Sequence, residues 1–270
     1  MIEATTIINT IIAVYSLFTA YKASQVEIKA PEPGNPKLPT VSQSRKIPLA
    51  VGRTLVTGPN VLDATGHTSH KRSDGYYMFY QSIEMGIAYG PGILYSIWMN
   101  DRKAWEGELS ADGDTANLFN RTLFGGRKTP GEGGIAGDIY FSRGDSAGYI
   151  FGGWEGKTGR DQPGYPMLSR VLFTSSDSRG FLWGNSPNYH PVSFEYGFFP
   201  NPLSAVDSVI GAVGQESANP AYVLYEILKN SEFGASSRAT VDDAAILAMG
   251  ATLYAEGLGI RRTWYTESAA

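Results

Sequence analysis

The sequence contains no cysteine, and this absence excludes several classes of site. A chain without thiols can form no disulfide, no cysteine nucleophile, and no zinc or iron–sulfur centre that uses cysteine ligands. Positive charge is also scarce, because 22 Lys and Arg residues stand against 26 Asp and Glu residues and give a formal net charge of −4. The chain therefore has no overall basic field that would attract nucleic acid or an anionic membrane.

The rest of the composition is that of a folded protein rich in turns. The 270 residues are enough for one large domain or two moderate ones with a sizeable core. Hydrophobic residues make up 42% and charged residues 18%, which is typical of globular rather than disordered chains. With 32 Gly and 15 Pro, the composition favours a β-rich body with many loops.

Residues 4–21 carry no charged side chain and show a helical pattern of apolar residues. We expect residues 1–29 to form an oligomerising or partner-binding helix. Isoleucine at several seam positions favours a coiled coil of three helices over one of two. The seam positions recur at alternating spacings of three and four, and they are Ala4, Ile7, Ile11, Val14, Phe18 and Tyr21.

Two other interpretations of residues 4–21 stay open. A signal peptide normally has a basic start and a small-x-small cleavage site, but Glu3 is the only early charge and no clear Ala-x-Ala follows. A transmembrane span needs about 20 mostly apolar residues, and Thr, Ser and Asn side chains interrupt this run. A membrane-anchored binding protein is therefore the alternative that rests on this segment.

A proline-rich linker at residues 30–46 follows the first helix and marks a boundary. Four prolines occur within residues 30–40, and proline both fixes φ and removes a backbone donor. After the linker, residues 47–202 have short β-branched and aromatic segments separated by Gly and Pro. We expect this region to be an antiparallel β-barrel or sandwich, which makes the whole chain mainly β with α, an α+β protein.

Three parts of this β-rich region have specific expectations. Residues 47–61 predict a hairpin with its turn at Gly58-Pro59. Residues 76–105 predict three apolar, aromatic-rich strands separated by turns. Residues 125–164 are rich in glycine and predict a long surface loop.

The composition changes in residues 203–260, which we expect to hold two helices. Asn219 followed by Pro220 is an N-cap with proline at the first helical position, and Asn230 ends this first helix. The predicted buried stripe of the first helix consists of Leu224, Ile227 and Leu228.

The second helix of this pair is predicted to begin at Thr240 and to end at Gly257. Residues 261–270 are predicted to start a further strand that enters something absent from the chain. The predicted buried stripe of the second helix consists of Ala245, Met249, Thr252 and Leu253.

Two motifs suggest ligand binding but lack the context it requires. Residues 131–136 fit the loose dinucleotide fingerprint GxGxxA, yet the flanks predict neither a preceding parallel strand nor a following helix. His67 and His70 form an HxxH pattern with Asp63 and Asp74 nearby, but the neighbouring Gly, Thr and Ser favour a solvated turn. We expect no cofactor and no metal ion.

Catalytic patterns are equally weak. Glu132, Glu155 and Asp161 lie in the glycine-rich region and offer the carboxylates of a hydrolase, without any supporting flanking pattern. Ser186 lacks the second glycine of a nucleophile elbow. We expect no catalytic residue, and a cell-wall-degrading hydrolase is kept as the enzyme alternative.

One stretch is specific enough to carry a resemblance. Residues 219–235 read NPAYVLYEILKNSEFGA, and they resemble a signature of the tail-tip, or baseplate, hub proteins of long-tailed phages, the family of the phage lambda tail tip protein J. Further segments resemble that family in the same order, and together they cover roughly residues 40–260. The signature positions here are Asn219, Pro220, Tyr222, Leu224, Tyr225, Leu228, Phe233 and Gly234.

The resemblance implies a structural virion protein rather than an enzyme. Such hubs are homotrimers that close the tail tube, contact the distal tail protein and the tape measure protein, and carry further hub or fibre proteins. DNA meets them only in transit through the lumen. The implied place is the distal end of the tail of a phage, tailocin or gene transfer agent, assembled in the host cytoplasm.

Two consequences concern this chain in particular. The seam of residues 1–29, with Ile7, Ile11, Val14, Phe18 and Tyr21, would lie in or near the lumen, against the tape measure protein or other copies of the chain. Family hubs usually continue for hundreds of residues, so the length here indicates a split hub or a partial chain. The hub role includes host attachment and DNA ejection.

Overall fold

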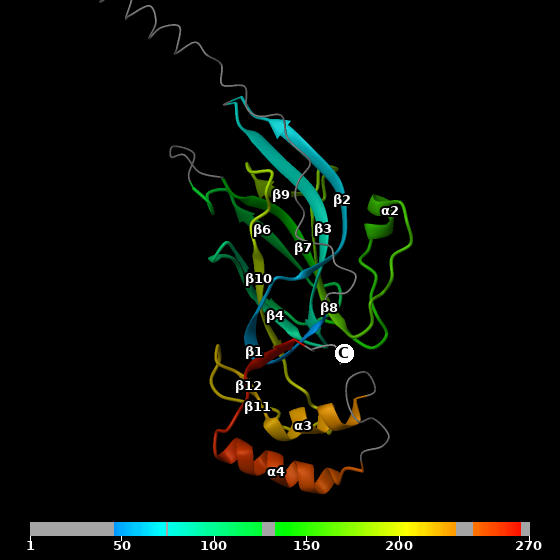
Figure 1. Ribbon diagram of the computed structural model, residues 1–270, viewed down its shortest axis with the longest axis vertical. Coiled ribbons are helices and arrows are strands. Elements are labelled where there is room, and N and C mark those ends of the chain that lie inside the picture. The colour runs from blue at the N-terminus through cyan, green and yellow to red at the C-terminus, as the bar shows by residue number, and fades with distance from the viewer. Residues whose placement is uncertain (1–45, 74, 126–132, 231–239, 266–270) are drawn as a thin grey trace, which may run out of the picture.

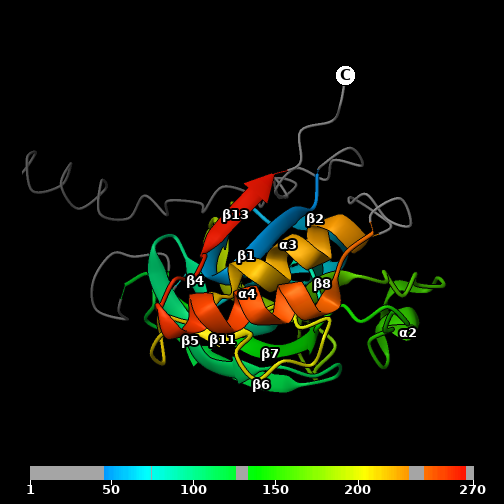
Figure 2. The ribbon, with the colours of Figure 1, turned by 90° about the horizontal axis from the view of Figure 1, so that it is seen from below.

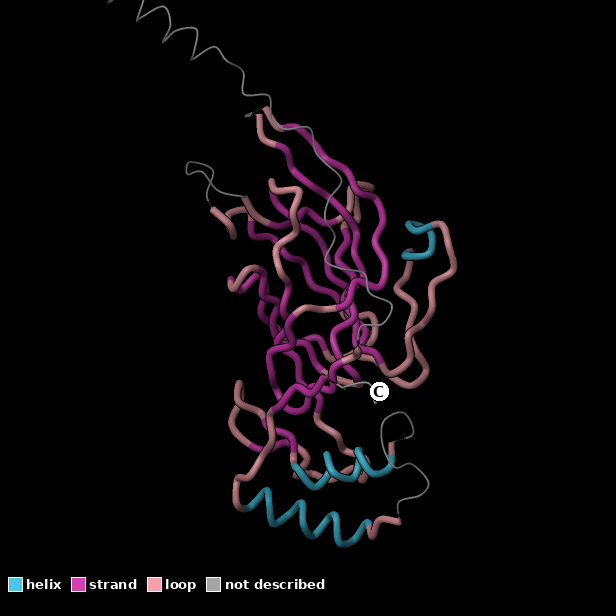
Figure 3. Tube along the Cα trace, in the orientation of Figure 1, coloured by secondary structure: helices cyan, strands magenta, loops and turns pink. Residues whose placement is uncertain are grey.

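The computed structural model describes residues 46–73, 75–125, 133–230 and 240–265 (Figure 1). Their strands form two large antiparallel sheets, and two helices lie together at one end of the β-body (Figures 1 and 3). The expectation of a mainly β, α+β protein is confirmed.

Several predictions fall outside the described residues. They are the helix at residues 1–29 with all of its seam positions, the linker up to residue 45, Asp74, Glu132, Phe233 and Gly234.

The first sheet has five strands in the order β13-β1-β10-β4-β5. Every neighbouring pair in it is antiparallel. The strands are β1 (Pro48–Thr57), β4 (Ile93–Met99), β5 (Arg102–Leu109), β10 (Val192–Phe198) and β13 (Arg262–Tyr265).

The second sheet follows the order β2-β3-β8-β7-β6, and the short strand β9 pairs with both β3 and β7. A separate two-stranded pair, β11 with β12, precedes the helices. The bounds are β2 (Asn60–Lys71), β3 (Tyr77–Tyr89), β6 (Thr115–Asn120), β7 (Ile135–Ser142), β8 (Leu168–Thr174), β9 (Phe181–Gly184), β11 (Val209–Ile210) and β12 (Ser217–Ala218).

Three helices complete the described chain: α2 (Trp154–Thr158), α3 (Pro220–Lys229) and α4 (Asp243–Ala255). Seen from below, α3 and α4 lie side by side across the end of the β-body (Figure 2). The short helix α2 lies apart from them, on the flank of the second sheet (Figure 3).

One hydrophobic core joins both sheets. It includes Val51 and Phe194 of the five-stranded sheet and Ile83 and Phe173 of the other sheet, all fully buried. Strands β3 and β8 are buried along most of their length, which explains their nearly continuous apolar runs. Close packing of these side chains between two sheets accounts for most of the stability of the body.

The predicted hairpin at residues 47–61 is wrong. Strands β1 and β2 do form there, but β1 pairs with β10 and β13 while β2 pairs with β3. The first half of β1, Pro48–Val51, pairs with β13, and its second half, from Gly52 to Thr57, pairs with β10. Gly58, at φ 61°, and Pro59 therefore lead the chain from one sheet to the other.

Residues 76–105 form the three expected strands, β3, β4 and β5. Asn100 and Asp101 both have positive φ, at 49° and 61°, and make the tight turn between β4 and β5. Strand β3 belongs to the second sheet and β4 to the first, so the Gly90-Pro91 segment is a crossing between sheets.

The long surface loop expected at residues 125–164 is also wrong. Residues 135–142 form β7, which pairs with β6 and β8 inside the second sheet. Glycine at position 137 allows neighbouring strands to approach closely. A Cβ there would lie 2.5 Å from both the Phe181 ring and the Thr174 carbonyl oxygen. Helix α2 also lies within this range.

The two predicted helices exist, but the predicted buried face is wrong for most of α3 and only partly right for α4. In α3 the fully buried side chains are Ala221, Tyr222 and Val223. Leu224 and Ile227 are instead 43% and 38% exposed. The first turn of α3 is buried together with its cap Asn219, because Ala221 and Tyr222 pack against Ile246 of α4.

In α4 the cap is Asp242 rather than Thr240, since the Asp242 side chain accepts from the backbone N–H groups of two residues in the first turn. The buried residues are Ile246 and Gly250. Met249 and Leu253 do pack against α3 as predicted, whereas Ala245 and Thr252 are exposed.

The C-terminal strand enters this same body. Residues 262–265 form β13, which pairs with β1 through register partners that include Pro48 with Tyr265. The expectation of a strand is confirmed for residues 262–265, and these residues pair within the described body. Its partner is the first strand of the described chain, which sequence patterns cannot reveal because the pairing is non-local.

Candidate functional site

Asn219 lies at the centre of a buried set of hydrogen bonds. Its side-chain Oδ1 accepts from the backbone N–H of Ala221 at 3.1 Å, which caps α3 as predicted. Its Nδ2 donates to the backbone carbonyls of Asp207 and Gly250, each at 2.9 Å. One fully buried amide therefore ties α3 to α4 and to the loop before β11.

Tyr222 completes this connection. Its hydroxyl donates to Oδ1 of Asp207 at 2.6 Å, and its ring packs with Ala221 and Ile246. Gly250 lies directly against it, because a Cβ at that position would be 2.5 Å from the hydroxyl oxygen of Tyr222. A glycine on α4 is therefore required for the close approach of the two helices.

The signature residues divide into a buried group and an outer group. Asn219, Pro220 and Tyr222 come together at the start of α3. Tyr225 packs between α3 and α4, whereas Leu224 points to solvent. The remaining signature residues are Leu228, which is half-buried, and two that lie outside the described residues, Phe233 and Gly234.

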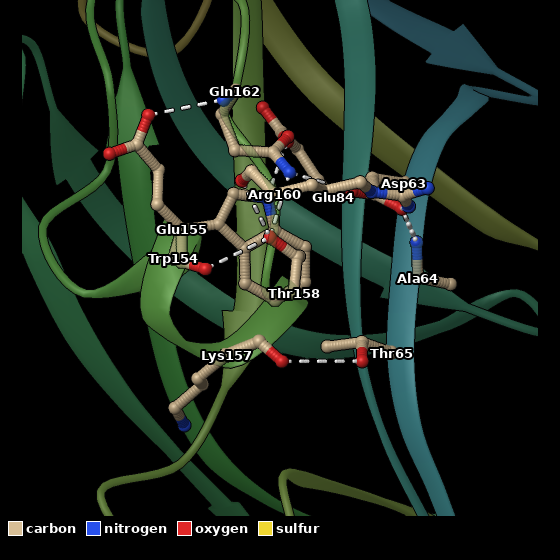
Figure 4. A network of polar contacts seen from close by, with 10 residues as sticks. All are labelled: Asp63, Ala64, Thr65, Glu84, Trp154, Glu155, Lys157, Thr158, Arg160 and Gln162. Atoms are coloured by element: carbon tan, nitrogen blue, oxygen red, sulfur yellow. Dashed lines mark hydrogen bonds and ion pairs between the residues drawn. The ribbon is translucent and has the colours of Figure 1, made fainter.

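A second buried polar cluster holds the segment between β7 and β8 against the sheet. Glu84 of β3 and Arg170 of β8 form an ion pair whose side chains are 0% and 1% exposed. The other carboxylate oxygen of Glu84 accepts from Nε1 of Trp154 at 2.8 Å (Figure 4). Arg170 also donates to the backbone carbonyls of Tyr149 and Gly164. These contacts attach α2 and its flanking loops to the second sheet.

The electrostatics of this cluster fit a structural role. Burial raises the pKa of the Glu84 carboxyl, and the charge and hydrogen bond of Arg170 oppose that shift. The Arg170 guanidinium carbon lies 5.0 Å from the ring centroids of Phe151 and of Tyr165. Both carboxylate oxygens already accept hydrogen bonds, so removing one partner would leave a buried charge uncompensated.

An outer network continues from this cluster to β2. Asp63 accepts hydrogen bonds from Arg160 and, at 3.0 Å, from Nε2 of Gln162. The same nitrogen of Gln162 donates to the Thr158 hydroxyl at 2.9 Å, and the backbone N–H of Gln162 donates to Glu155 at 3.1 Å (Figure 4). The network therefore fixes the C-terminal end of α2 over β2.

A third polar cluster crosses the five-stranded sheet. Arg53 of β1 pairs with Glu195 of β10 at 2.7 Å and with Glu216 at 3.3 Å. The Ser96 hydroxyl donates to the other oxygen of Glu195 at 2.7 Å, and Arg53 lies 4.0 Å from the ring centroid of Tyr95. Burial raises the pKa of Glu195, but the hydrogen bonds from Arg53 and Ser96 outweigh it and hold that pKa below its usual value.

The HxxH motif lies on a strand and not on the predicted turn. His67 and His70 are exposed residues of β2, and Asp63 is engaged by the network described above. Within the described ranges, no group of three or more His, Asp or Glu residues is placed to hold a metal ion.

The carboxylates considered for hydrolysis do not form a described pair. Glu155 accepts from the Gln162 backbone, Asp161 is exposed, and Glu132 lies outside the described residues. The GxGxxA stretch leads into β7 instead of a helix, so no helix N-terminus faces a phosphate there. The Ser186 hydroxyl accepts from the backbone N–H of Asn188 at 3.2 Å.

Sequence reasoning missed the Glu84–Arg170 pair, although a signal for it exists. Each residue interrupts an otherwise apolar strand, in QSIEMG and in LSRVLF. Opposite charges that interrupt two buried strands indicate a buried ion pair, because an isolated charge there is too costly. The two residues are 86 positions apart in the sequence, so local patterns do not reveal their pairing.

A scan against protein-family models and a search of curated proteins found no match to this chain. None of the helices in the part of the chain that the structure describes is long and apolar enough to cross a membrane. The geometry of the three polar clusters and of the α3–α4 pair is therefore the basis for a functional proposal.

Proposed function

We propose that this protein is a structural hub of the tail tip of a phage or phage-like tail. The proposal starts from the resemblance of residues 219–235 to the hub signature. The observation that carries it is the role of Asn219, whose buried amide clamps α3, α4 and the preceding loop together. A signature residue used in this way preserves shape, which is what an assembly protein requires.

The polar clusters support the same interpretation. The Glu84–Arg170 pair is enclosed, and Asp63 and Arg53 each bridge segments that are distant in sequence. The charged groups of the Glu84–Arg170 cluster, of its outer network at Asp63 and of the Arg53 cluster all hold strands and loops together. We infer a protein without catalytic activity, cofactor or metal.

The finer parts of the proposal concern assembly. The two sheets are taken to form the barrel or sandwich body of a homotrimer that closes the tail tube. Its partners are the distal tail protein, the tape measure protein and further hub or fibre proteins, with DNA passing only in transit. The net charge of −4 favours such passage, since a wall without basic excess does not retain DNA.

The deciding experiment is electron cryomicroscopy of intact particles that contain the protein, with a tagged copy to mark its position. The expected result is density for the described fold at the distal end of the tail tube, repeated three times about the axis. Particles whose tube end contains no copy of this chain would contradict the proposal.

A separate assay addresses the hydrolase alternative. The purified chain and its Glu155→Gln variant are run on gels that contain peptidoglycan, beside a known wall hydrolase. Neither form is expected to clear the gel. A cleared band with the natural chain that disappears with Glu155→Gln would replace the structural assignment with an enzymatic one.

A further inference from the structure

Helix α4 is apolar on every side. Its sequence DAAILAMGATLYA contains no charged residue after Asp243. A helix without a polar face is normally surrounded by protein or by lipid, because its exposed surface gains little from water. The surroundings of α4 should therefore be apolar on more than one side.

Only one side of α4 is covered by described residues. Ile246 and Gly250 are buried against α3. Leu247, Ala251 and Tyr254 recur at i, i+4 and i+7, which places them on one face. Leu247 and Tyr254 on this outer α4 face are 41% and 51% exposed, and Ala251 is exposed as well.

The chain itself contains a segment suited to this face. Residues 4–21 carry no charge and have an apolar seam of helical spacing. The described chain reaches the body at β1, where Pro48 pairs with Tyr265 of β13, and β13 follows α4 after a short connection. Residues 22–45 can span up to about 80 Å when extended, so the linker does not limit where residues 4–21 bind.

Charge selects one orientation for this contact. Asp242 and Asp243 lie at the start of α4, and Glu256 follows its end. Lys22 follows the uncharged run and Glu3 precedes it. An antiparallel arrangement places Lys22 near two aspartates and Glu3 near only one carboxylate, Glu256, and it sets the two helix dipoles in opposite directions. A parallel arrangement would bring Glu3 against both aspartates and Lys22 near Glu256 alone, so the antiparallel one is favoured.

We propose that, in the chain before assembly, residues 4–21 pack antiparallel on the outer α4 face as a third helix beside α3 and α4. This contact removes two apolar surfaces from water at once. It concerns the free chain and does not rest on the tail-tip function, which an unassembled protein does not perform.

Cross-linking tests the contact directly, and the absence of cysteine makes every introduced thiol unique. Two double variants follow one antiparallel register: Ala244→Cys with Phe18→Cys, and Ala255→Cys with Ile7→Cys. A crossed control combines Ala244→Cys with Ile7→Cys. A short bismaleimide is added to each variant of the full chain at low protein concentration.

The expected product is an intramolecular cross-link in both register variants and little of it in the crossed control. A dominant product in the crossed control would mean a parallel arrangement and overturn the proposal. Cross-linked dimers alone would show that a second copy supplies the segment, and unreacted chains would show no contact, so either outcome also overturns it.

A second variant separates loss of the contact from loss of the fold. Ala251→Glu places a charge in the middle of the outer α4 face, and Thr115→Glu places one at an exposed position of β6. Each is added to the Ala255→Cys, Ile7→Cys chain. Ala251→Glu is expected to abolish the cross-link while circular dichroism stays unchanged, and Thr115→Glu is expected to preserve it. Equal cross-linking in both variants would overturn the proposal.

Discussion

At the scale of single residues, a few buried polar side chains hold together segments that are far apart in the sequence. Asn219 is the clearest case. Its side-chain amide caps α3 and also donates hydrogen bonds to one backbone carbonyl in each of two other segments. Buried backbone carbonyls that lose their donor become costly. Replacing such a residue should therefore lower the free energy of unfolding by more than replacing an ordinary helix cap does.

We predict that Asn219→Ala lowers the free energy of unfolding by about 2–3 kcal/mol, because a lost cap and two unsatisfied carbonyls add together. Urea titration followed by tryptophan fluorescence measures the change. The matched control is Asp242→Ala, which removes the exposed cap of α4 and should cost only about 1 kcal/mol. Equal losses in the two variants would contradict the clamp role of Asn219.

A second residue-scale prediction concerns acid. The folded state holds the pKa of Glu195 below its usual value, so the Arg53 pair stabilises the protein above the unfolded pKa of about 4.3. That contribution is lost as pH falls below about 4.3 and through the lower folded pKa. Glu195→Gln should therefore be less stable than the natural chain at neutral pH.

The measurement is the urea midpoint of both chains at neutral pH and at about pH 3.5, below the unfolded pKa of the carboxyl. The difference in urea midpoint between the natural chain and Glu195→Gln should be smaller at the lower pH. A difference that stays constant would mean that the Glu195 carboxylate does not stabilise the fold through its charge.

At the scale of elements, α2 and its flanking loops depend on the buried Glu84–Arg170 pair. We predict that Arg170→Met alone lowers the free energy of unfolding by about 3–5 kcal/mol, because the Glu84 carboxylate stays buried without its partner. Adding Glu84→Leu should restore much of this loss, since apolar side chains of similar size fill the same space.

A double-mutant cycle in urea measures this coupling, and hydrogen exchange at residues 154–158 reports whether α2 detaches. In Arg170→Met the α2 amides should exchange faster relative to those of β4 in the other sheet. Losses that simply add in the double variant would contradict a coupled pair.

Elements also show how far local sequence determines this fold. The start and end of α3 were predicted correctly, because Asn219, Pro220 and Asn230 act through their own backbone neighbours. The predicted buried face of α3 is wrong at Leu224 and Ile227, and that of α4 is right only at Met249 and Leu253, because an apolar side chain occurs whether or not a partner covers it. Periodicity finds a helix but does not identify its neighbour.

Strand pairing had the same limit. The sequence predicts β1 and β2 as strands, but β1 pairs with β10, which lies far along the chain, and β2 pairs with the next strand, β3, instead of with β1. The glycines near β7 suggested a loop because glycine permits both looseness and close approach, and only the contact with Phe181 distinguishes the two. The Glu84–Arg170 cluster required both strands to be paired first.

At the scale of the whole molecule, the five-stranded sheet is completed by pairing between the first and last strands of the described chain. Strand β13 covers the outer edge of β1 along Pro48–Val51, and its Trp264 packs on the shared core. An uncovered strand edge exposes backbone groups that can pair with another molecule.

We predict that deleting residues 262–270 lowers the free energy of unfolding by about 2–4 kcal/mol through lost strand bonds and Trp264 burial. The truncated chain should also self-associate through β1. Urea titration and size-exclusion chromatography with light scattering measure both effects. Deleting only residues 266–270 is the control and should change stability by less than about 0.5 kcal/mol. Matching behaviour of the two truncations would contradict the role of β13.

The pairing of Pro48 with Tyr265 also has a practical consequence for labelling. Adjacent antiparallel strands lie about 5 Å apart, so fluorophores attached directly before β1 and after β13 would lie close together at one edge of the sheet. Their energy transfer would be high in the native protein and would collapse on denaturation. The same adjacency makes a circular permutant practicable, with a short bridge from Tyr265 to Pro48 and new ends placed between α3 and α4.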